Sequence, residues 1–433
     1  MKALLRPFLV ILALVLVIAL VAPAAVVAQD DDPILIGASL PLTGDFSIPG
    51  AKHQEGYQLC VDLINERGGL LGRPVELITS DNRSDVEQAL SQYERLINED
   101  QVDLIFGTFS SRLTFPTSAV AQQNEMIFPV PAGGALSIYV QGFDYLFYFQ
   151  QNVSEYTGQT PIEMLQELVP DDLPASAAVV HADDFFANAI AAGLVGESLE
   201  DDDGNVLADL APGALADAGI ELVAREIYPG EGFSDWLTLA TTVKDSGAEM
   251  VIALTASPAE AIEFTRALQT VDHLPKILYM SQGTQIEFLE GVGAEAAEGV
   301  AIHSAWHPRA NFEGELLGEP FTNQDFIDAY SAAYDGAEPD EDVAIPFSVC
   351  QGMTTAVQAV GSTDNTELRD WLASRTEDEP VRTILGNFNW DERGIPIGNS
   401  FVMTQWQDGQ LELVYPVGEF EGTADLVYPK PSW

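Results

Sequence analysis

Short aliphatic runs alternate with amphipathic helical patterns along this chain, and this alternation limits the fold more than any other feature. A first series of predicted strands, dense in Ile, Leu, Val and Phe as buried strands are, covers residues 33–40, 75–79, 103–106, 126–131 and 145–150. Helical patterns lie between them, over residues 52–67 and 81–99. Strands separated by helices form parallel sheets with right-handed crossovers, so the sequence predicts an α/β fold.

The alternation then starts again. A second series of strands is predicted over residues 177–181, 220–227, 250–254, 277–280 and 299–303, with helices over 184–199, 233–246 and 259–270. The chain has 433 residues, which is more than one hydrophobic core usually organises. We therefore expect two Rossmann-like lobes with parallel sheets. The acidic, Gly- and Ala-rich stretch 201–218 is predicted to be an extra loop or a short helix.

The N-terminal segment has the pattern of an export signal. Lys2 and Arg6 precede an apolar run over residues 8–22, and small residues lead to Ala28. This order predicts a signal peptide over residues 1–28 and an exported mature chain. The alternative is an uncleaved anchor, since apolar character approaches the length that spans a bilayer. No later segment is expected to be long and apolar enough to span one.

The charge balance excludes some partners. The chain carries 67 acidic and 18 basic residues, a formal net charge of −49. Nucleic acids and anionic membrane surfaces repel such a chain, so neither is an expected partner.

The chain has two cysteines, Cys60 and Cys350. Two are too few for a disulfide framework or a four-cysteine metal site. One bridge between them is possible in an exported protein, but buried free thiols are the expectation here.

The segment Phe106–Ser111 combines a strand end, a glycine turn and two hydroxyls, and a helical pattern begins directly after it. This order places Ser110, Ser111 and free backbone N–H groups at the C-terminal edge of a parallel sheet. Small ligands bind at that edge, and a helix N-terminus favours negative charge there. The alternative is that one serine only caps the helix.

Four segments in register resemble the periplasmic solute-binding proteins of ABC importers, of the branched-chain amino-acid (leucine/isoleucine/valine) type. They are Ile36–Gly44, Ile64–Leu77, Gly107–Ser111 and Gly386–Gly394. The resemblance implies a type I periplasmic binding fold, in which three chain crossings join the lobes. Here these crossings are expected near Gln150, Trp306 and Asn387. Lobe 1 would then comprise residues 33–150 and 308–387, and lobe 2 residues 151–307 and 388–433.

The resemblance also implies ligand-binding positions. Ser110 and Ser111 match the loop that holds the ligand carboxylate in this family. A second loop of lobe 1 corresponds to Pro131, Ala132 and Gly133, where Ala132 lacks the family's hydroxyl. On lobe 2, Phe186 and Ser257 fall where the family often has Tyr.

The family pairs the ligand's ammonium with a Glu, whose position corresponds to Gln282 and Gly283. Neither residue is an anion, and a buried ammonium needs one. Asp183 and Asp184, which lie beside Phe186 in the sequence, are the expected substitutes. If neither serves, the solute should lack an ammonium, as amides, urea-like solutes and carboxylic acids do.

Other motifs give no enzyme or metal site. His303 and His307 are four residues apart, but no HExxH context or third ligand accompanies them. No nucleophile elbow or phosphate-binding loop is present. We therefore expect a monomeric, non-enzymatic protein without a cofactor that closes on a small solute, most simply an amino acid, and presents it to a membrane permease. A secreted hydrolase is the alternative from another class.

Overall fold

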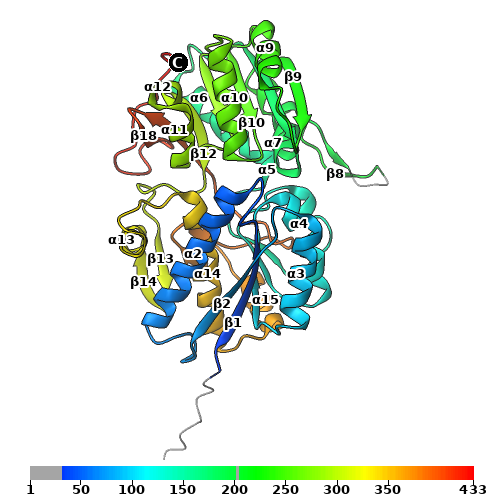
Figure 1. Cartoon of the computed structure of the whole chain (residues 1–433), viewed down its shortest axis with the longest axis vertical. Helices are drawn as coiled ribbons and strands as arrows, with labels where there is room; N and C mark the ends of the chain where they lie inside the picture. Colours follow the sequence, from blue (N-terminus) through cyan, green and yellow to red (C-terminus); the bar gives the residue numbers. More distant parts are fainter. Residues whose placement is uncertain (1–31, 201–203) are drawn as a thin grey trace, which may run out of the picture.

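The computed structural model describes residues 32–200 and 204–433, and it has two α/β lobes stacked along the long axis (Figure 1). The predicted fold class is therefore confirmed. The predicted signal peptide, residues 1–28, lies outside the described residues, as do residues 201–203.

Lobe 1 is built on a narrow parallel sheet in the order β2-β1-β3. These strands are β1 (Ile34–Leu40), β2 (Val75–Asp81) and β3 (Leu104–Phe106), and β4 (Phe128–Val130) pairs in parallel with β5 (Leu146–Tyr148). The N–H of Gly107 donates to the carbonyl of Pro129, at 3.1 Å, and so connects the end of β3 to β4. The strands predicted in this half of the chain are thus all present.

The helices of lobe 1 flank this sheet. They are α2 (Ser47–Glu66), α3 (Val86–Asn98), α4 (Ser111–Gln123), the 3-10 helix η1 (Leu136–Ile138), α13 (Asn323–Ala333), α14 (Glu341–Val360) and α15 (Asn365–Ala373). Two hairpins complete the lobe: β13 (Glu313–Leu316) with β14 (Glu319–Thr322), and β15 (Val381–Thr383) with β16 (Gly386–Phe388).

The helix α14 corrects one expectation from the sequence. Within the described part of the chain it is long and apolar enough, by length and composition, to cross a membrane. However, 78% of its most apolar window is buried inside the protein. Its apolar residues form the core of lobe 1, which explains its composition.

Lobe 2 contains one seven-stranded sheet in the order β18-β17-β12-β11-β10-β6-β9. Its parallel part comprises β6 (Ser176–Asp183), β9 (Glu221–Pro229), β10 (Met250–Leu254), β11 (Ile277–Met280) and β12 (Val300–Ser304). At one edge, β17 (Val402–Gln407) and β18 (Gln410–Tyr415) add as antiparallel strands.

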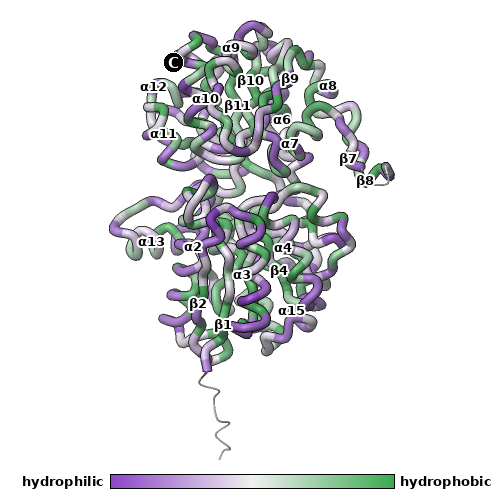
Figure 2. The backbone as a smooth tube through the Cα atoms, turned by 45° about the vertical axis from the view of Figure 1, so that its right-hand side comes forward, coloured by the Kyte–Doolittle hydropathy of each residue, from purple (hydrophilic) through white to green (hydrophobic). Residues whose placement is uncertain are grey.

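The helices of lobe 2 cover this sheet. They are α5 (Ser154–Thr157), α6 (Gln159–Leu168), α7 (Phe185–Val195), α8 (Ala214–Asp217), α9 (Trp236–Ser246), α10 (Pro258–Thr270), α11 (Ile286–Val292) and α12 (Ala294–Ala297). The extra stretch after α7 contains a short pair of strands, β7 (Leu199–Glu200) and β8 (Val206–Ala208), besides the short helix α8. Figure 2 shows hydrophobic chain in central strands such as β10 and β11, and a largely hydrophilic α3 at the surface.

The two cysteines form a disulfide, so the expectation of free thiols was wrong. Cys60 of α2 is bonded to Cys350 of α14, with their Cα atoms 6.3 Å apart. The two helices approach closely because Gly56 has no side chain: a Cβ there would lie 2.3 Å from the carbonyl oxygen of Val343. Residues 290 positions apart in the sequence are therefore neighbours in the core of lobe 1.

The third crossing between the lobes lies later than Asn387, where we expected it. Trp390 packs against Phe147 and Phe149, and its indole N–H donates to the carbonyl of Tyr148, at 2.7 Å. Phe401 also packs in lobe 1, whereas Met403 packs in lobe 2. By packing, residues 388–401 therefore extend lobe 1, because these aromatic side chains fill its core.

The other two crossings lie within a few residues of the expected positions. The first follows Val153, which packs in lobe 1, and the second follows β12 directly. Gln151 joins two of the connecting segments, because its amide donates to the carbonyls of Ala305 and Leu385, at 2.9 and 3.0 Å. This buried glutamine thus links the first crossing both to the second crossing and to the β15–β16 hairpin of lobe 1.

Candidate functional site

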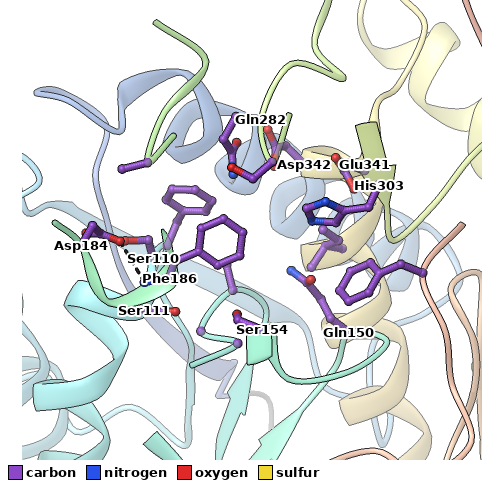
Figure 3. Close-up of a pocket in the computed structure, with 18 of the residues that line it drawn as sticks. Ser110, Ser111, Gln150, Ser154, Asp184, Phe186, Gln282, His303, Glu341 and Asp342 are labelled. Carbon is purple, nitrogen blue, oxygen red and sulfur yellow. Dashed lines mark hydrogen bonds between the residues drawn. The ribbon is translucent and has the colours of Figure 1, made fainter. Parts of the chain in front are cut away.

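A pocket lies between the lobes, where loops after the strands of both sheets meet (Figure 3). Lobe 1 and the hinge contribute Phe109, Ser110, Ser111, Ala132, Gly133, Gly134, Tyr148, Gln150, Ser154, Glu341, Asp342, Ile345 and Phe401. Lobe 2 contributes Asp184, Phe186, Ala256, Ser281, Gln282 and His303. The cavity volume is about 60 Å³, so the lobes leave little space between them.

Both predicted serines line this pocket at the start of α4. Ser110 occupies the N-cap position, yet its side chain makes no capping hydrogen bond, and its buried Oγ has no partner among the described residues. Ser111 Oγ accepts from the N–H of Ala135, at 3.3 Å. The alternative that Ser110 only caps the helix therefore does not account for its hydroxyl, which remains available at a helix N-terminus that favours an anion.

The second predicted loop lies beside the serines. Ala132 and Gly133 line the pocket, whereas Pro131 does not, and its carbonyl accepts from the amide of Gln150 at 2.7 Å. Gly134 also lines the pocket. A Cβ at Gly134 would lie 2.4 Å from Ser154 Oγ, so this loop can pass close to the hinge only as glycine.

On lobe 2, Phe186 and Gln282 line the pocket, and two predicted residues do not. Ser257 caps α10 by accepting from the N–H of Glu260, at 3.4 Å, so its hydroxyl is used in the helix. The carbonyl of Gly283 accepts from the indole of Trp406, at 2.8 Å.

The two candidate acids after β6 differ. Asp183 is exposed and accepts from the amide of Asn188, at 3.0 Å, outside this pocket. Asp184 lines the pocket with 5% of its surface exposed. Its Oδ1 accepts from the N–H of Phe186, at 3.0 Å, as the N-cap of α7, while its buried Oδ2 has no partner among the described residues.

Burial raises the pKa of Asp184, and the N–H groups of Phe186 and Ala187 and the charge of Arg112 oppose this effect. Arg112 lies in the first turn of α4, directly after the two serines. Asp184 thus has one unused carboxyl oxygen close to the serine loop. A ligand ammonium placed there would supply this oxygen with a donor and would favour the ionised carboxylate.

Two further acids line the pocket that the sequence did not reveal. Glu341 and Asp342 lie in the first turn of α14 and accept hydrogen bonds from lobe 2. Glu341 accepts at both oxygens: Thr284 Oγ1 donates to Oε1 at 2.7 Å, and Ser304 Oγ and the N–H of Ala305 donate to Oε2 at 2.8 Å. Asp342 accepts at Oδ2 from Gln285 Nε2, at 2.7 Å.

The only signal for these acids in the sequence was a run of Asp and Glu directly before an apolar helix. In a chain this acidic, such a run reads as ordinary helix-start chemistry. Burial raises the pKa of both carboxyls, and for Asp342 the charges of Asp340 and Glu341 raise it further.

The two histidines that we considered as metal ligands are engaged separately. His303 lines the pocket, and its Nδ1 lies 2.9 Å from Tyr279 Oη. His307 instead contacts the carbonyl of Leu411 and the N–H of Arg309. Burial lowers the pKa of His303 to about 3 and that of His307 to about 4, so both rings are neutral. No group of three His, Cys, Asp or Glu side chains within residues 32–200 and 204–433 could hold a metal ion.

Unpartnered buried polar atoms gather around this pocket. Two of them, Ser110 Oγ and Asp184 Oδ2, belong to residues that line the pocket. Two others lie just behind the lining: Thr255 Oγ1, whose residue precedes Ala256 of the lining, and Gln285 Oε1, whose residue donates to Asp342. Buried polar groups in folded proteins normally have hydrogen-bond partners. Several exceptions in one place indicate a site that a polar ligand completes.

The family model for the periplasmic binding protein matches residues 33–410. The chain belongs to the periplasmic binding protein family. Among curated relatives, the Leu/Ile/Val-binding protein homolog 1 of Brucella suis is 25% identical over 395 residues, covering 90% of this chain and 95% of the relative.

Solved structures share the fold. The branched-chain amino acid transporter substrate binding protein LivJ of Streptococcus pneumoniae, in complex with isoleucine, aligns with a TM-score of 0.71 at 21% identity, covering 89% of this chain and all of that one. A solute binding protein of an ABC transporter from R. palustris, in complex with benzoate, aligns with a TM-score of 0.70 at 17% identity, covering 93% and 98%. At these identities the likeness shows the two-lobed fold of type I periplasmic binding proteins.

Proposed function

We propose that this protein is the extracytoplasmic solute-binding component of an ABC importer and that it holds an amino acid between its two lobes. One observation carries the proposal: the pocket combines an unused serine hydroxyl at a helix N-terminus on lobe 1 with an unused buried carboxylate oxygen, Asp184 Oδ2, on lobe 2. A free amino acid has a carboxylate and an ammonium on the same carbon. The serine hydroxyl can donate to the carboxylate, and the oxygen of Asp184 can accept from the ammonium.

The α-carboxylate would lie at the start of α4. It would accept hydrogen bonds from Ser110 and from the first backbone N–H groups of the helix, where the helix dipole favours an anion. The α-ammonium would donate to Asp184 on the facing lobe. Because each lobe supplies one of the two contacts, the ligand stabilises the closed arrangement over the open one.

The charges of the lining disfavour a solute that has only a carboxylate. Asp184, Glu341 and Asp342 line the pocket, and no Lys or Arg of the described residues does. A carboxylate ligand without an ammonium would therefore lie among three carboxyl groups, with no lysine or arginine in the described lining to pair with it. Neutral amides and urea-like solutes do not carry this cost, and they are the alternative that the experiment below tests.

Membership of the family supports an exported location and a permease as partner. The lobes would close about the segments near residues 150, 305 and 402, and the closed, loaded protein would deliver its solute to the permease. A monomer is sufficient for this cycle, because both halves of the site come from one chain.

Thermal shift with a panel of amino acids, amides and carboxylic acids tests the proposal, followed by calorimetry with leucine and its deaminated analogue 4-methylpentanoate. A bound solute at a hundredfold excess over Kd should stabilise the protein by about 2.7 kcal/mol. Leucine should bind more tightly than the analogue. Equal or tighter binding of 4-methylpentanoate would contradict the amino-acid assignment, and chemical conversion of a bound solute would favour a hydrolase.

Asp184→Asn and Asp183→Asn form a matched pair of variants for the ammonium contact. Asn is also a good N-cap, so Asp184→Asn keeps the contact with the N–H of Phe186 and should fold. Removing this charge leaves a buried ammonium unpaired, which costs about 3–5 kcal/mol in affinity. Asp183→Asn, one residue away and outside the pocket, should leave affinity unchanged. Equal affinities of the two variants would remove Asp184 from the site.

A further inference from the structure

The pocket has acidic groups at two separate places. Figure 3 shows Asp184 with Ser110 on one side and Asp342, Glu341, Gln282 and His303 on the other, with aromatic rings between them. A ligand whose carboxylate and ammonium occupy the first side extends its side chain toward the second. Under the proposed function, the residues on that second side select the side chain.

Glu341 and Asp342 differ in how far their oxygens are used. Both oxygens of Glu341 accept hydrogen bonds from lobe 2, from Thr284 and from Ser304 with Ala305. Asp342 is 5% exposed, and the hydrogen bond to its carboxylate recorded within the described residues is that from Gln285 to Oδ2. Glu341 therefore forms a wall of the pocket, whereas Asp342 retains capacity for a ligand.

Asp342 also makes no ion pair within the described residues, although the charge of Lys52 reaches it. The nearby Lys52 pairs with Asp340, its Nζ lying 3.3 Å from Asp340 Oδ2. Glu341 and Glu287 add further negative charge to this end of the pocket, and His303 is neutral there. A buried carboxylate without a counter-charge is costly, so a cation entering here would be favoured.

We infer that Asp342 makes this protein select amino acids whose side chain ends in a hydrogen-bond-donating nitrogen, above all a short cationic one. The inference rests on the proposed function, since it assumes that the serine loop and Asp184 hold the α-carboxylate and α-ammonium. A branched aliphatic side chain would instead cover the carboxylate of Asp342 without donating to it, at the cost of a lost hydrogen bond.

The size of the cavity favours a short side chain. Its volume of about 60 Å³ is well below the roughly 150 Å³ that accommodates benzene in a protein core. The lobes must therefore separate somewhat for any amino acid, and the required separation grows with side-chain length. Diaminobutyrate has a side chain that is both cationic and short, because its side-chain ammonium is carried by the second carbon beyond the α-carbon.

Calorimetry with L-2,4-diaminobutyrate and L-norvaline tests the inference, because the two ligands have the same shape and differ in the terminal ammonium. The protein should bind diaminobutyrate at least about tenfold more tightly, as expected for hydrogen bonds to charged groups. In Asp342→Asn, which still accepts from Gln285, the preference should disappear. The control is Glu338→Gln, which changes an exposed acid in the segment just before α14, outside the pocket lining, and which should retain the preference.

The ratio of the two affinities should also depend on pH. Protonation of Asp342 competes with the ligand's cation, so the preference for diaminobutyrate should weaken as the pH is lowered in the wild type and should not do so in Asp342→Asn. Burial and the charges of Asp340 and Glu341 raise the pKa of Asp342, while Lys52 lowers it.

The outcomes separate the inference from the function beneath it. Norvaline binding as tightly as diaminobutyrate, or a preference unchanged in Asp342→Asn, would overturn the inference while amino-acid binding stands. Failure of norvaline, diaminobutyrate and leucine to bind at all would overturn the proposed function and the inference with it.

Discussion

The two lobes share one α/β architecture, but different features stabilise the inside of each lobe. Lobe 2 has a continuous seven-stranded sheet, whose central strands β6, β10 and β11 are buried along almost their whole length. Lobe 1 has a narrower sheet, and its helices α2 and α14 pack closely and are cross-linked by Cys60–Cys350. Lobe 1 therefore combines a small sheet with a covalent bond between two of its helices, whereas the described part of lobe 2 contains no disulfide.

The lobes also contribute unequally to the pocket. Lobe 1 supplies the serine hydroxyls, a helix N-terminus and the acids of α14, whereas lobe 2 supplies Asp184 and most of the hydrogen-bond donors to those acids. This difference predicts that lobe 1 contains both residues that determine stability, such as the cysteines, and residues that determine affinity, such as the serines. We expect the largest change on removing the disulfide, intermediate changes at Glu155 and the serines, and the smallest in overall shape.

Removing the disulfide should destabilise lobe 1 selectively. The bond joins residues 290 positions apart, and closing so long a loop is worth about 5 kcal/mol in chain-entropy estimates. Cys60→Ser with Cys350→Ser should lower the unfolding temperature, and hydrogen exchange should increase in α2 and α14 before it does in β6 and β10. Equal loss of protection in both lobes would mean that they unfold as one unit.

The second prediction concerns Glu155, which connects the two lobes by a hydrogen bond to the main chain of lobe 1. The carboxylate of Glu155 accepts from the N–H of Leu136 in lobe 1, at 3.0 Å. Its backbone packs closely against Gly193 of lobe 2: a Cβ on this glycine would lie only 1.6 Å from the carbonyl oxygen of Glu155. Burial raises the pKa of Glu155 from 4.5 to about 7.

Because the folded-state pKa is raised, the unfolded state releases its proton first as pH rises. Stability should therefore fall between pH 4.5 and 7, by about 3 kcal/mol from this group. Glu155→Gln should be more stable than wild type at pH 8 and similar at pH 4, as measured by denaturant unfolding. The exposed Glu163→Gln, on the neighbouring α6, should show no such difference, and a pH-independent effect of Glu155→Gln would contradict the explanation.

The serines test the contribution of lobe 1 to affinity. Ser110→Ala and Ser111→Ala each remove a donor to a charged ligand group, which is worth about 1.5–3 kcal/mol, or roughly tenfold to a hundredfold in Kd. Ser110→Ala should keep full stability, because its hydroxyl has no protein partner among the described residues. Ser118→Ala, in the same helix but outside the pocket, is the control for calorimetry. Unchanged affinity in both variants would exclude this loop from the site.

The smallest expected change is in overall shape. A ligand held by both lobes favours the closed over the open arrangement, so it should reduce the radius of gyration in small-angle scattering relative to an unliganded protein that also populates open arrangements. The oligomeric state should not change. Identical profiles with and without a saturating ligand would place the site within one lobe and remove the functional difference between them.

Local patterns in the amino-acid sequence were enough to predict the fold class and most of the serine side of the pocket. The aliphatic runs that become β1 and β10 are read correctly because a parallel strand is buried on both faces, and burial shows directly in composition. Ser110 and Ser111 were found for a similar reason, since a strand, a glycine turn and a helix start are consecutive in the chain. Asp184 was proposed because it lies two residues before Phe186.

Contacts between residues far apart in the sequence could not be predicted in this way. The pairing of Cys60 with Cys350, the late third crossing beyond Trp390, and the place of Asp342 beside the pocket all depend on how complete lobes pack. A local sequence pattern indicates whether a residue is buried, but it does not indicate which distant residue will contact it. In a chain with 67 acidic residues, the few buried ones become distinguishable only when the lobes are assembled around them.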